Sequence, residues 1–196
     1  MSGSPPGLVL ASSSRYRKAL LDRLGLVYAS VSPDIDESAL PGEIPAATAQ
    51  RLALSKAQRV AADFPDALII GSDQVAVLDG RLLGKPGSHA AASAQLQAMS
   101  GRETVFQTAL VLLDAASGRS DGAVVPTTVR MRQLTAAQIE RYLRRDEPYD
   151  CAGSAKIEAL GITLVESVDS SDPTALIGLP LIALTGMLLR AGIVLP

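Results

Sequence analysis

The sequence predicts an α/β fold in which helices flank a central mixed β-sheet. Short apolar runs at residues 8–11 and 67–70 are bounded by turn-forming residues, as expected of buried strands. Between these two strand candidates, the sequence contains segments with helix-capping residues and an apolar stripe, which predict helices. Asp79-Gly80 separates two further strand candidates, residues 75–78 and 81–83, and this dipeptide is typical of a two-residue hairpin. The hairpin adds antiparallel pairing, so the sheet is expected to be mixed.

In the first half of the chain, each element is marked by its turn and cap residues. After the strand at residues 8–11, Ser12 to Ser14 offer N-caps for a helix that runs to about Leu24 and is stopped by Gly25. Residues 27–31 form a second, weaker strand candidate, followed by the acidic loop at residues 34–37. Pro45 then starts a helix that carries an apolar stripe.

In the second half, helix and strand signals continue to alternate without a linker or an internal repeat. The expected elements are a helix at residues 88–99, strands at 104–113 and 124–132, a helix capped by Thr135, a strand over Gly161–Glu166, and a final helical region from Asp172-Pro173. Residues 1–196 are therefore expected to form one domain. Residues 1–6 are expected to be disordered or vector-derived.

Composition excludes several classes of protein. The chain has 196 residues, 47% of them hydrophobic, and a net charge of −2, which does not suit a protein that binds long nucleic acid through a basic face. A single cysteine, Cys151, excludes an intramolecular disulfide framework, and a single histidine, His89, excludes a His-rich metal site. The most apolar segment, Leu176 to Leu189, is too short and too interrupted to span a bilayer. No signal peptide is evident, so a cytoplasmic location is expected.

Asp73 is the first candidate for chemistry. It lies in Gly71-Ser72-Asp73-Gln74, directly behind the apolar run at residues 67–70, where the strand is expected to leave the core. Ligand sites in α/β proteins collect at the carboxyl ends of strands, so a carboxylate here suits a catalytic base. The alternative is a turn Asp that caps the next element.

A second candidate is an anion site at the start of the first helix. Ser12 lies before the helix, and Arg15, Arg17 and Lys18 fall in its first turn, where the helix dipole already favours anions over cations. A bound phosphate would make this arrangement favourable, because helix N–H groups, hydroxyls and guanidinium groups all donate to it. The alternative is a solvated basic turn.

Two lysines and an acidic pair complete the set. Lys56 falls on the apolar stripe of its helix, so its ammonium must either extend to the surface or meet an anion, and Lys85 is held in Gly84-Lys85-Pro86. Asp36-Glu37 and Asp73 are the carboxylates best suited to share Mg²⁺ or Mn²⁺, unless the acidic loop is only a solvated turn. Together these groups suit hydrolysis of a phosphoanhydride. The sequence has no P-loop.

The chain resembles the Maf family of nucleoside triphosphate pyrophosphatases from Leu8 to Arg190. The matching segments are residues 10–14, Asp36-Glu37, residues 54–57, 71–74, 84–86, Ser100-Gly101, 151–154 and 172–181. The resemblance implies a Maf/ITPase-like α/β fold with two lobes around a deep cleft, a divalent metal, frequent homodimers, and release of pyrophosphate from a nucleotide. It makes Asp73 the proton acceptor, Lys56 and Lys85 phosphate ligands, and Glu37 a metal ligand.

Within the family, Gln74 and Glu158 resemble the branch that hydrolyses 7-methyl-GTP rather than dTTP and UTP. Tyr16 fits the same branch, since an aromatic ring can stack on a positively charged methylated guanine while the Glu158 carboxylate accepts from its N1–H and amino group. The chain departs from the family at Arg15 and Lys18, where Pro and Arg are usual, and a Lys lacks the bidentate phosphate contact of Arg. Alternatives are a dTTP and UTP pyrophosphatase and a nucleotide-binding regulator of septum formation.

Overall fold

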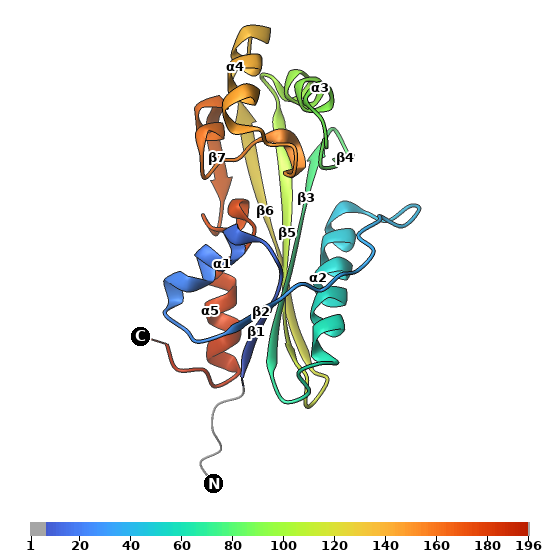
Figure 1. The fold of residues 1–196 in the computed structure, drawn as a ribbon, viewed down its shortest axis with the longest axis vertical. Helices are drawn as coiled ribbons and strands as arrows, with labels where there is room; N and C mark the ends of the chain where they lie inside the picture. Colours follow the sequence, from blue (N-terminus) through green and yellow to red (C-terminus); the bar gives the residue numbers. More distant parts are fainter. Residues whose placement is uncertain (1–6, 196) are drawn as a thin grey trace. The chain divides into compact units, whose positions relative to one another are not determined.

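The computed structural model describes residues 7–195, so the expectation for residues 1–6 concerns residues outside the described part. Its sheet is mixed, with the strand order β2-β1-β3-β5-β6-β7 and with β4 paired to β3 (Figure 1). β1 pairs in parallel with β2 and β3, whereas the pairs β3–β4 and β6–β7 are antiparallel. The strands are β1 (Leu8–Ala11), β2 (Ala29–Val31), β3 (Leu68–Leu78), β4 (Arg81–Leu83), β5 (Glu103–Asp114), β6 (Ser120–Met131) and β7 (Val165–Ser170). The predicted α/β fold with a mixed sheet is confirmed.

Five α-helices accompany the sheet in the described residues. They are α1 (Arg15–Leu21), α2 (Pro45–Ala61), α3 (His89–Met99), α4 (Ala136–Asp146) and α5 (Leu181–Arg190). The first four lie where the sequence predicts a helix, and the short turn η1 (Asp22–Leu24) extends α1 to Gly25, whose φ of 64° ends it. The final helical region expected from Asp172-Pro173 contains only the short 3₁₀ turn Ala175–Ile177 before α5 begins at Leu181. None of these helices is long and apolar enough to cross a membrane.

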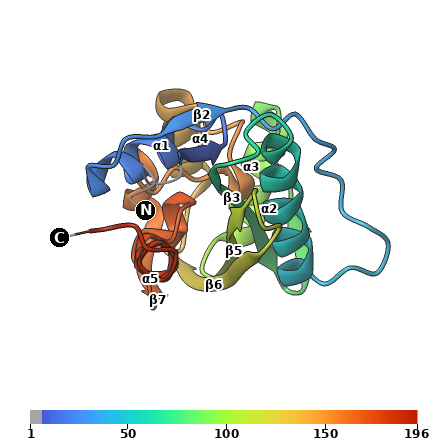
Figure 2. The ribbon, with the colours of Figure 1, turned by 90° about the horizontal axis from the view of Figure 1, so that it is seen from below.

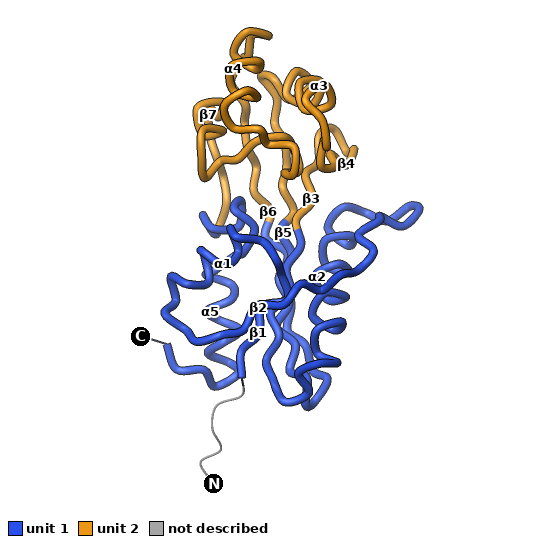
Figure 3. Tube along the Cα trace, in the orientation of Figure 1, with its two compact units in different colours: residues 1–73, 108–125, 172–196 blue, residues 74–107, 126–171 orange. Residues whose placement is uncertain are grey.

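The chain forms two compact units that are interleaved in sequence (Figure 3). Unit 1 takes the described residues of 1–73, 108–125 and 172–196, and unit 2 takes residues 74–107 and 126–171. The boundary falls inside β3, between Asp73 and Gln74. Each unit is therefore assembled from segments that are distant along the chain.

In unit 1, helices cover both faces of the strands. α1 and α5 lie on one face and α2 on the other (Figures 1 and 2). The core on the α1 and α5 side consists of aliphatic residues from β1, α1, β3, β5 and α5, including Leu10, Leu20, Ile70, Leu110 and Leu184, all at 1% exposure or less. Burial of this apolar surface holds the strands in place, including the polar residues that continue β3 beyond Ile70.

In unit 2, side-chain caps and polar contacts organise α3 and α4. The Ser88 side chain caps α3, and Thr135 with Gln138 forms a capping box at the start of α4. His89 joins the two helices, because Nε2 lies 2.8 Å from Glu140 Oε2 while Nδ1 lies 3.0 Å from the Tyr149 hydroxyl. The predicted hairpin is also present, with φ positive at Asp79 and Gly80.

The strand predicted over Gly161–Glu166 is wrong in position. Residues Leu160–Leu164 form a 3₁₀ turn, η3, and strand β7 begins only at Val165. The turn forms because the Ala159 and Gly161 N–H groups both donate to the Lys156 carbonyl, which curls the chain back on itself. A Cβ at Gly161 would lie only 2.5 Å from that carbonyl oxygen, so the close approach depends on glycine.

Candidate active site

Asp73 lies within a strand rather than at its exit, which corrects the prediction. β3 continues through Gly71-Ser72-Asp73 to Leu78, and Asp73 is only 7% exposed. The polar residues remain buried because they have partners. The Ser72 hydroxyl contacts the carbonyl oxygens of Ala109 at 2.8 Å and Gly178 at 2.9 Å, and these come from distant parts of the chain. A buried polar strand segment of this kind is stable only when its groups are hydrogen-bonded.

Helix α2 packs closely against β3 at Gly71. A Cβ at that position would lie 2.1 Å from the Ala53 carbonyl oxygen and 3.0 Å from the Ala57 Cβ, so only glycine allows this approach. Ala53 and Ala57 are themselves fully buried on the helix face that meets the strand. Small residues on both elements therefore bring Lys56, which lies between Ala53 and Ala57 in α2, within reach of Asp73.

Lys56 joins two carboxylates. It lies on the buried face of α2 at 4% exposure, and its Nζ is 2.5 Å from Asp73 Oδ1 and 2.6 Å from Glu37 Oε1. Of the two outcomes considered for Lys56, an anion contact is the one observed. The two carboxylate oxygens can be no farther apart than the sum of these distances, so the structure brings Asp73, Lys56 and Glu37 into one cluster.

Arg17 lies close to this cluster. Its Nε donates to the Gly178 carbonyl at 2.8 Å, the same oxygen that the Ser72 hydroxyl contacts. Burial lowers the pKa of Arg17, while the negative charges of Asp73 and Glu37 act in the opposite direction. The loop around Gly178 therefore links α1 to β3 and places a guanidinium group in the field of both carboxylates.

The carboxylates of Asp73 and Glu37 fit a hard divalent cation. Mg²⁺ and Mn²⁺ prefer oxygen ligands, and Mg²⁺ commonly takes only one or two carboxylates and completes its shell with phosphate and water. No group of three or more His, Cys, Asp and Glu side chains that could hold a metal occurs among residues 7–195. Asp73 and Glu37 together match the one or two carboxylates that Mg²⁺ commonly takes beside phosphate and water.

The other candidates of unit 1 lie at or near the start of α1. The Ser12 hydroxyl is buried and accepts from the Ser14 N–H, and the Ser14 side chain caps α1. Tyr16 is half-buried, and its ring lies under the Arg15 guanidinium, whose carbon is 4.7 Å from the ring centroid. Lys18 is half-buried in the same helix. One face of the Tyr16 ring thus already meets a cation.

Three predicted site residues belong to unit 2. Gln74 follows Asp73 on β3 and is half-buried, Lys85 follows β4 and is exposed, and Glu158 is exposed between the turn η2 (Ala152–Ser154) and η3. Gly84, next to Lys85, accepts a hydrogen bond from the Gln95 side chain at 3.0 Å through its carbonyl, which ties this segment to α3. Gln95 also contacts Ser154 Oγ at 2.6 Å, so one side chain of α3 contacts two of the motif segments.

Sequence reasoning missed two groups that shape the site. Asp172, 2% exposed, accepts from the Thr174 and Ile182 N–H groups and so fixes the loop that contains Gly178 to the start of α5. Arg51 of α2 contacts the acidic loop through Ser38 and Glu43. The sequence offers a signal for the first only, since an Asp-x-Thr step can form a local turn that precedes a helix.

The reactivity of Cys151 tests the packing around this residue in unit 2. Burial, with the Asp150 charge beside it, raises the pKa of this thiol to about 12. We expect iodoacetamide at pH 8 to alkylate it about a thousandfold more slowly than an ordinary thiol, because the thiolate is the reacting form. Mass spectrometry of native and urea-unfolded protein measures the difference, since unfolding should restore the usual rate. Rates within tenfold of each other would contradict the buried environment.

Comparison with known proteins gives a consistent result over nearly the whole chain. A family model described as Maf-like protein matches residues 7–191. A protein named 7-methyl-GTP pyrophosphatase from Cupriavidus pinatubonensis (strain JMP 134 / LMG 1197) is 58% identical over 193 residues, covering 98% of this chain and 97% of the relative. The protein of the same name from Thiobacillus denitrificans (strain ATCC 25259 / T1) is 56% identical over 193 residues, covering 98% and 96%. That from Burkholderia pseudomallei (strain K96243) is 57% identical over 192 residues, covering 96% and 89%.

Proposed function

Because the chain belongs to the Maf family, we propose that it hydrolyses 7-methyl-GTP to 7-methyl-GMP and pyrophosphate. The observation that carries this proposal is identity of 56–58% over nearly full length to relatives named for that activity. The cluster of Asp73, Lys56 and Glu37 supports the chemistry, since a carboxylate and an ammonium lie together where a metal could also bind. Removal of a modified nucleotide in this way is a housecleaning reaction.

The proposed reaction is an in-line attack of water on the α-phosphorus. The water oxygen forms a bond to phosphorus, the bond from phosphorus to the oxygen that bridges to the β-phosphate breaks, and pyrophosphate leaves. Asp73 takes the proton from the attacking water, while Lys56 and Lys85 balance charge on the phosphates. A divalent cation, Mg²⁺ or Mn²⁺ held by Glu37 and Asp73, supplies further charge neutralisation when bound.

The residues at the start of α1 fit the rest of the substrate. Ser12, Arg17 and Lys18 offer a hydroxyl and two cations for phosphate oxygens. Tyr16 offers an aromatic face for the methylated base, either opposite Arg15 or in its place. Gln74 and Glu158 complete the proposal as residues that select the base.

The proposal extends to the state of the protein: the chain acts as one domain, forms a homodimer and works in the cytoplasm. Light scattering during gel filtration tests the dimer.

The central experiment compares pyrophosphate release from 7-methyl-GTP, UTP and dTTP with Mg²⁺ present. We expect 7-methyl-GTP to give the highest kcat/KM of the three. Faster turnover of UTP or dTTP would overturn the assignment of the base but keep the reaction. Binding of nucleotides without any hydrolysis would overturn the reaction itself and favour a regulatory role.

Glu158→Gln tests how the base is recognised. We expect kcat/KM for 7-methyl-GTP to fall by about 10- to 100-fold, because hydrogen bonds that involve a charged group contribute about 1.5–3 kcal/mol. Turnover of UTP should not change. Glu166→Gln, at an exposed carboxylate on β7 of the same unit, is the matched control. An equal loss for all three nucleotides would refute a role for Glu158 in base selection.

A further inference from the structure

The acidic loop that carries Glu37 has little regular structure of its own. Residues 32–44 connect β2 to α2 without helix or strand, and the side chains of Asp36, Glu37 and Ser38 are exposed. The Glu37 side chain keeps 45% of its surface exposed even though its carboxylate meets the buried Lys56 ammonium. A loop with no backbone ladder needs side-chain contacts to hold one conformation.

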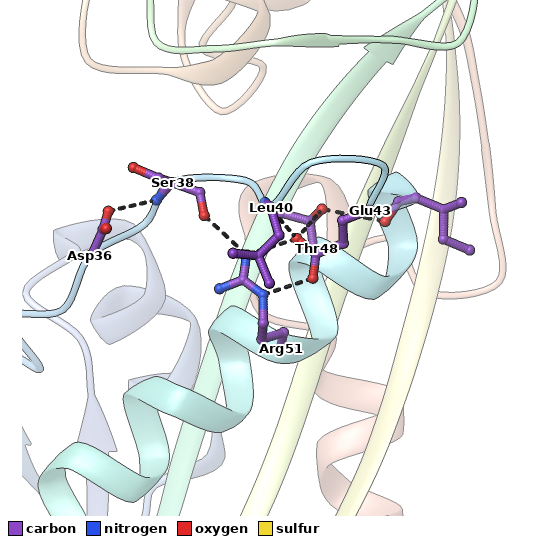
Figure 4. A network of polar contacts seen from close by, with 7 residues as sticks. Asp36, Ser38, Leu40, Glu43, Thr48 and Arg51 are labelled. Atoms are coloured by element: carbon purple, nitrogen blue, oxygen red, sulfur yellow. Dashed lines mark hydrogen bonds and ion pairs between the residues drawn. The ribbon is translucent and has the colours of Figure 1, made fainter.

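Arg51 of α2 supplies such contacts in the middle of the loop and at its end before α2 (Figure 4). Its Nε and Nη2 lie 2.7 and 2.8 Å from the two carboxylate oxygens of Glu43, a bidentate pair. The same Nη2 donates to the Ser38 carbonyl at 3.0 Å. One guanidinium group therefore binds residue 43, just before α2, and residue 38, immediately after Glu37.

Glu43 is fixed in turn by further partners. Its Oε2 accepts from the Leu40 N–H at 3.2 Å and from the Thr48 hydroxyl at 3.0 Å, and its side chain is only 11% exposed. The hydrogen bonds from Arg51 are the main cause that lowers the pKa of Glu43 to about 2. Within the loop, Asp36 accepts from the Ser38 N–H at 2.9 Å (Figure 4). The loop is thus tied to α2 by a connected network centred on Arg51.

Two side chains of one helix hold neighbouring residues of the loop. Lys56 meets the Glu37 carboxylate, and Arg51, five residues earlier on α2, meets the carbonyl of Ser38. A helix keeps such a spacing fixed, at about 7.5 Å of rise for five residues. Because Glu37 and Ser38 are adjacent in the chain, a contact that holds the Ser38 peptide also limits where the Glu37 carboxylate can go.

We propose that Arg51 is a positioning residue, which acts through Glu43 and the Ser38 carbonyl to hold the Glu37 carboxylate beside Lys56 and Asp73. The proposal rests on the proposed function only for what Glu37 does there, namely to hold a divalent cation. Without Arg51, the carboxylate keeps its chemistry but loses its fixed place. Outer contacts that orient a metal ligand commonly affect metal affinity by about 10- to 100-fold when removed.

The test compares Arg51→Ala with Arg59→Ala. Arg59 lies two turns further along α2 and pairs only on the surface with Asp63, so it is a matched control. The first measurement is amide hydrogen exchange without metal or nucleotide. We expect faster exchange over residues 36–43 in Arg51→Ala alone, with α2 beyond Arg51 unchanged. Unchanged exchange in the loop, or acceleration spread over the whole unit, would overturn the proposal.

The second measurement is the affinity for Mn²⁺, determined by calorimetry in the presence of a non-hydrolysable nucleotide. We expect Arg51→Ala to weaken binding by about tenfold or more and Arg59→Ala to leave it unchanged. Glu43→Gln, which keeps the shape of the side chain, should weaken binding less and in the same direction. Wild-type affinity in both variants would refute the positioning role.

The third measurement is a double-mutant comparison with Glu37→Gln. If Arg51 acts through Glu37, the loss of kcat/KM caused by Arg51→Ala should largely disappear in the Glu37→Gln background. Losses that multiply independently would instead mean that Arg51 acts by another route. If wild-type protein hydrolyses no nucleotide, the proposed function fails while exchange and Mn²⁺ binding still decide the role of Arg51.

Discussion

Asp73→Asn is expected to reduce pyrophosphate release by about 10²- to 10⁴-fold, the usual contribution of a general base. The amide has nearly the shape of the carboxylate, so it fits the same place on β3, and its oxygen can still accept from Lys56, 2.5 Å from the present carboxylate. It takes up no proton from water and is a poorer ligand for a hard cation. Steady-state assays with 7-methyl-GTP measure the loss, which should fall mainly on kcat.

Asp66→Asn is the control for this substitution. Asp66 is an exposed carboxylate two residues before β3 begins, so the same chemical change there should leave turnover within a factor of two of wild type. Thermal unfolding of both variants shows whether the fold is kept. If Asp73→Asn retained more than a tenth of wild-type kcat with the fold intact, another group would have to be the base.

Gly71→Ala is expected to be the most destabilising small substitution in unit 1. The new Cβ would approach the Ala53 carbonyl oxygen to 2.1 Å, and a helix backbone cannot yield as the end of a flexible side chain can. Overpacking typically costs about 1–3 kcal/mol of the free energy of unfolding, and a clash with backbone places this substitution at the upper end, about 3 kcal/mol. In a chain of this length, a loss of that size lowers Tm by roughly 6–12 °C.

The same substitution should also reduce activity, because relief of the clash requires α2 to move away from β3 and separates Lys56 from Asp73. Gly122→Ala on β6 is the control, since a Cβ there meets its nearest neighbours at 3.5 Å, an ordinary contact. Differential scanning calorimetry and the pyrophosphate assay together decide the outcome. A Gly71→Ala protein as stable as the control would mean that α2 and β3 are not packed as described.

Much of the fold was predictable because local signals carried it. Pro45 begins α2, Ser88 and Thr135 cap α3 and α4, and Asp79-Gly80 forms the hairpin, each for reasons that act within a few residues. The continuation of β3 through Gly71-Ser72-Asp73 was harder to predict, because polar residues normally mark the end of a buried strand. Ser72 stays buried only because carbonyls of Ala109 and Gly178 meet it, and the local sequence contains no sign of them.

The candidate site likewise contains residues that the sequence could identify and others that it could not. Lys56 could be singled out because an ammonium on an apolar helix face must either extend to the surface or meet an anion. Asp73 and Glu37 could be singled out as carboxylates near a strand end and in the acidic loop, and the family resemblance assigned them to the reaction. Arg51 could not be singled out, because a half-exposed arginine on a helix is usually a solvated residue. Its contacts depend on the path of the loop at residues 32–44, which has no periodic pattern to read.

The interleaved make-up of unit 1 has a consequence for synthesis on the ribosome. Lys56 and Asp73 are translated before α5, yet the core on the opposite face of the strands from α2 includes Leu184 and Leu188 of α5, and the Gly178 carbonyl that binds Arg17 and Ser72 also comes from a segment later than both. Until α5 emerges, Leu10 and Ile70 lack part of their apolar cover. The contacts around the cluster of Asp73, Lys56 and Glu37 are therefore complete only after α5 has been synthesised, and a nascent chain stalled before residue 172 would expose aggregation-prone strands.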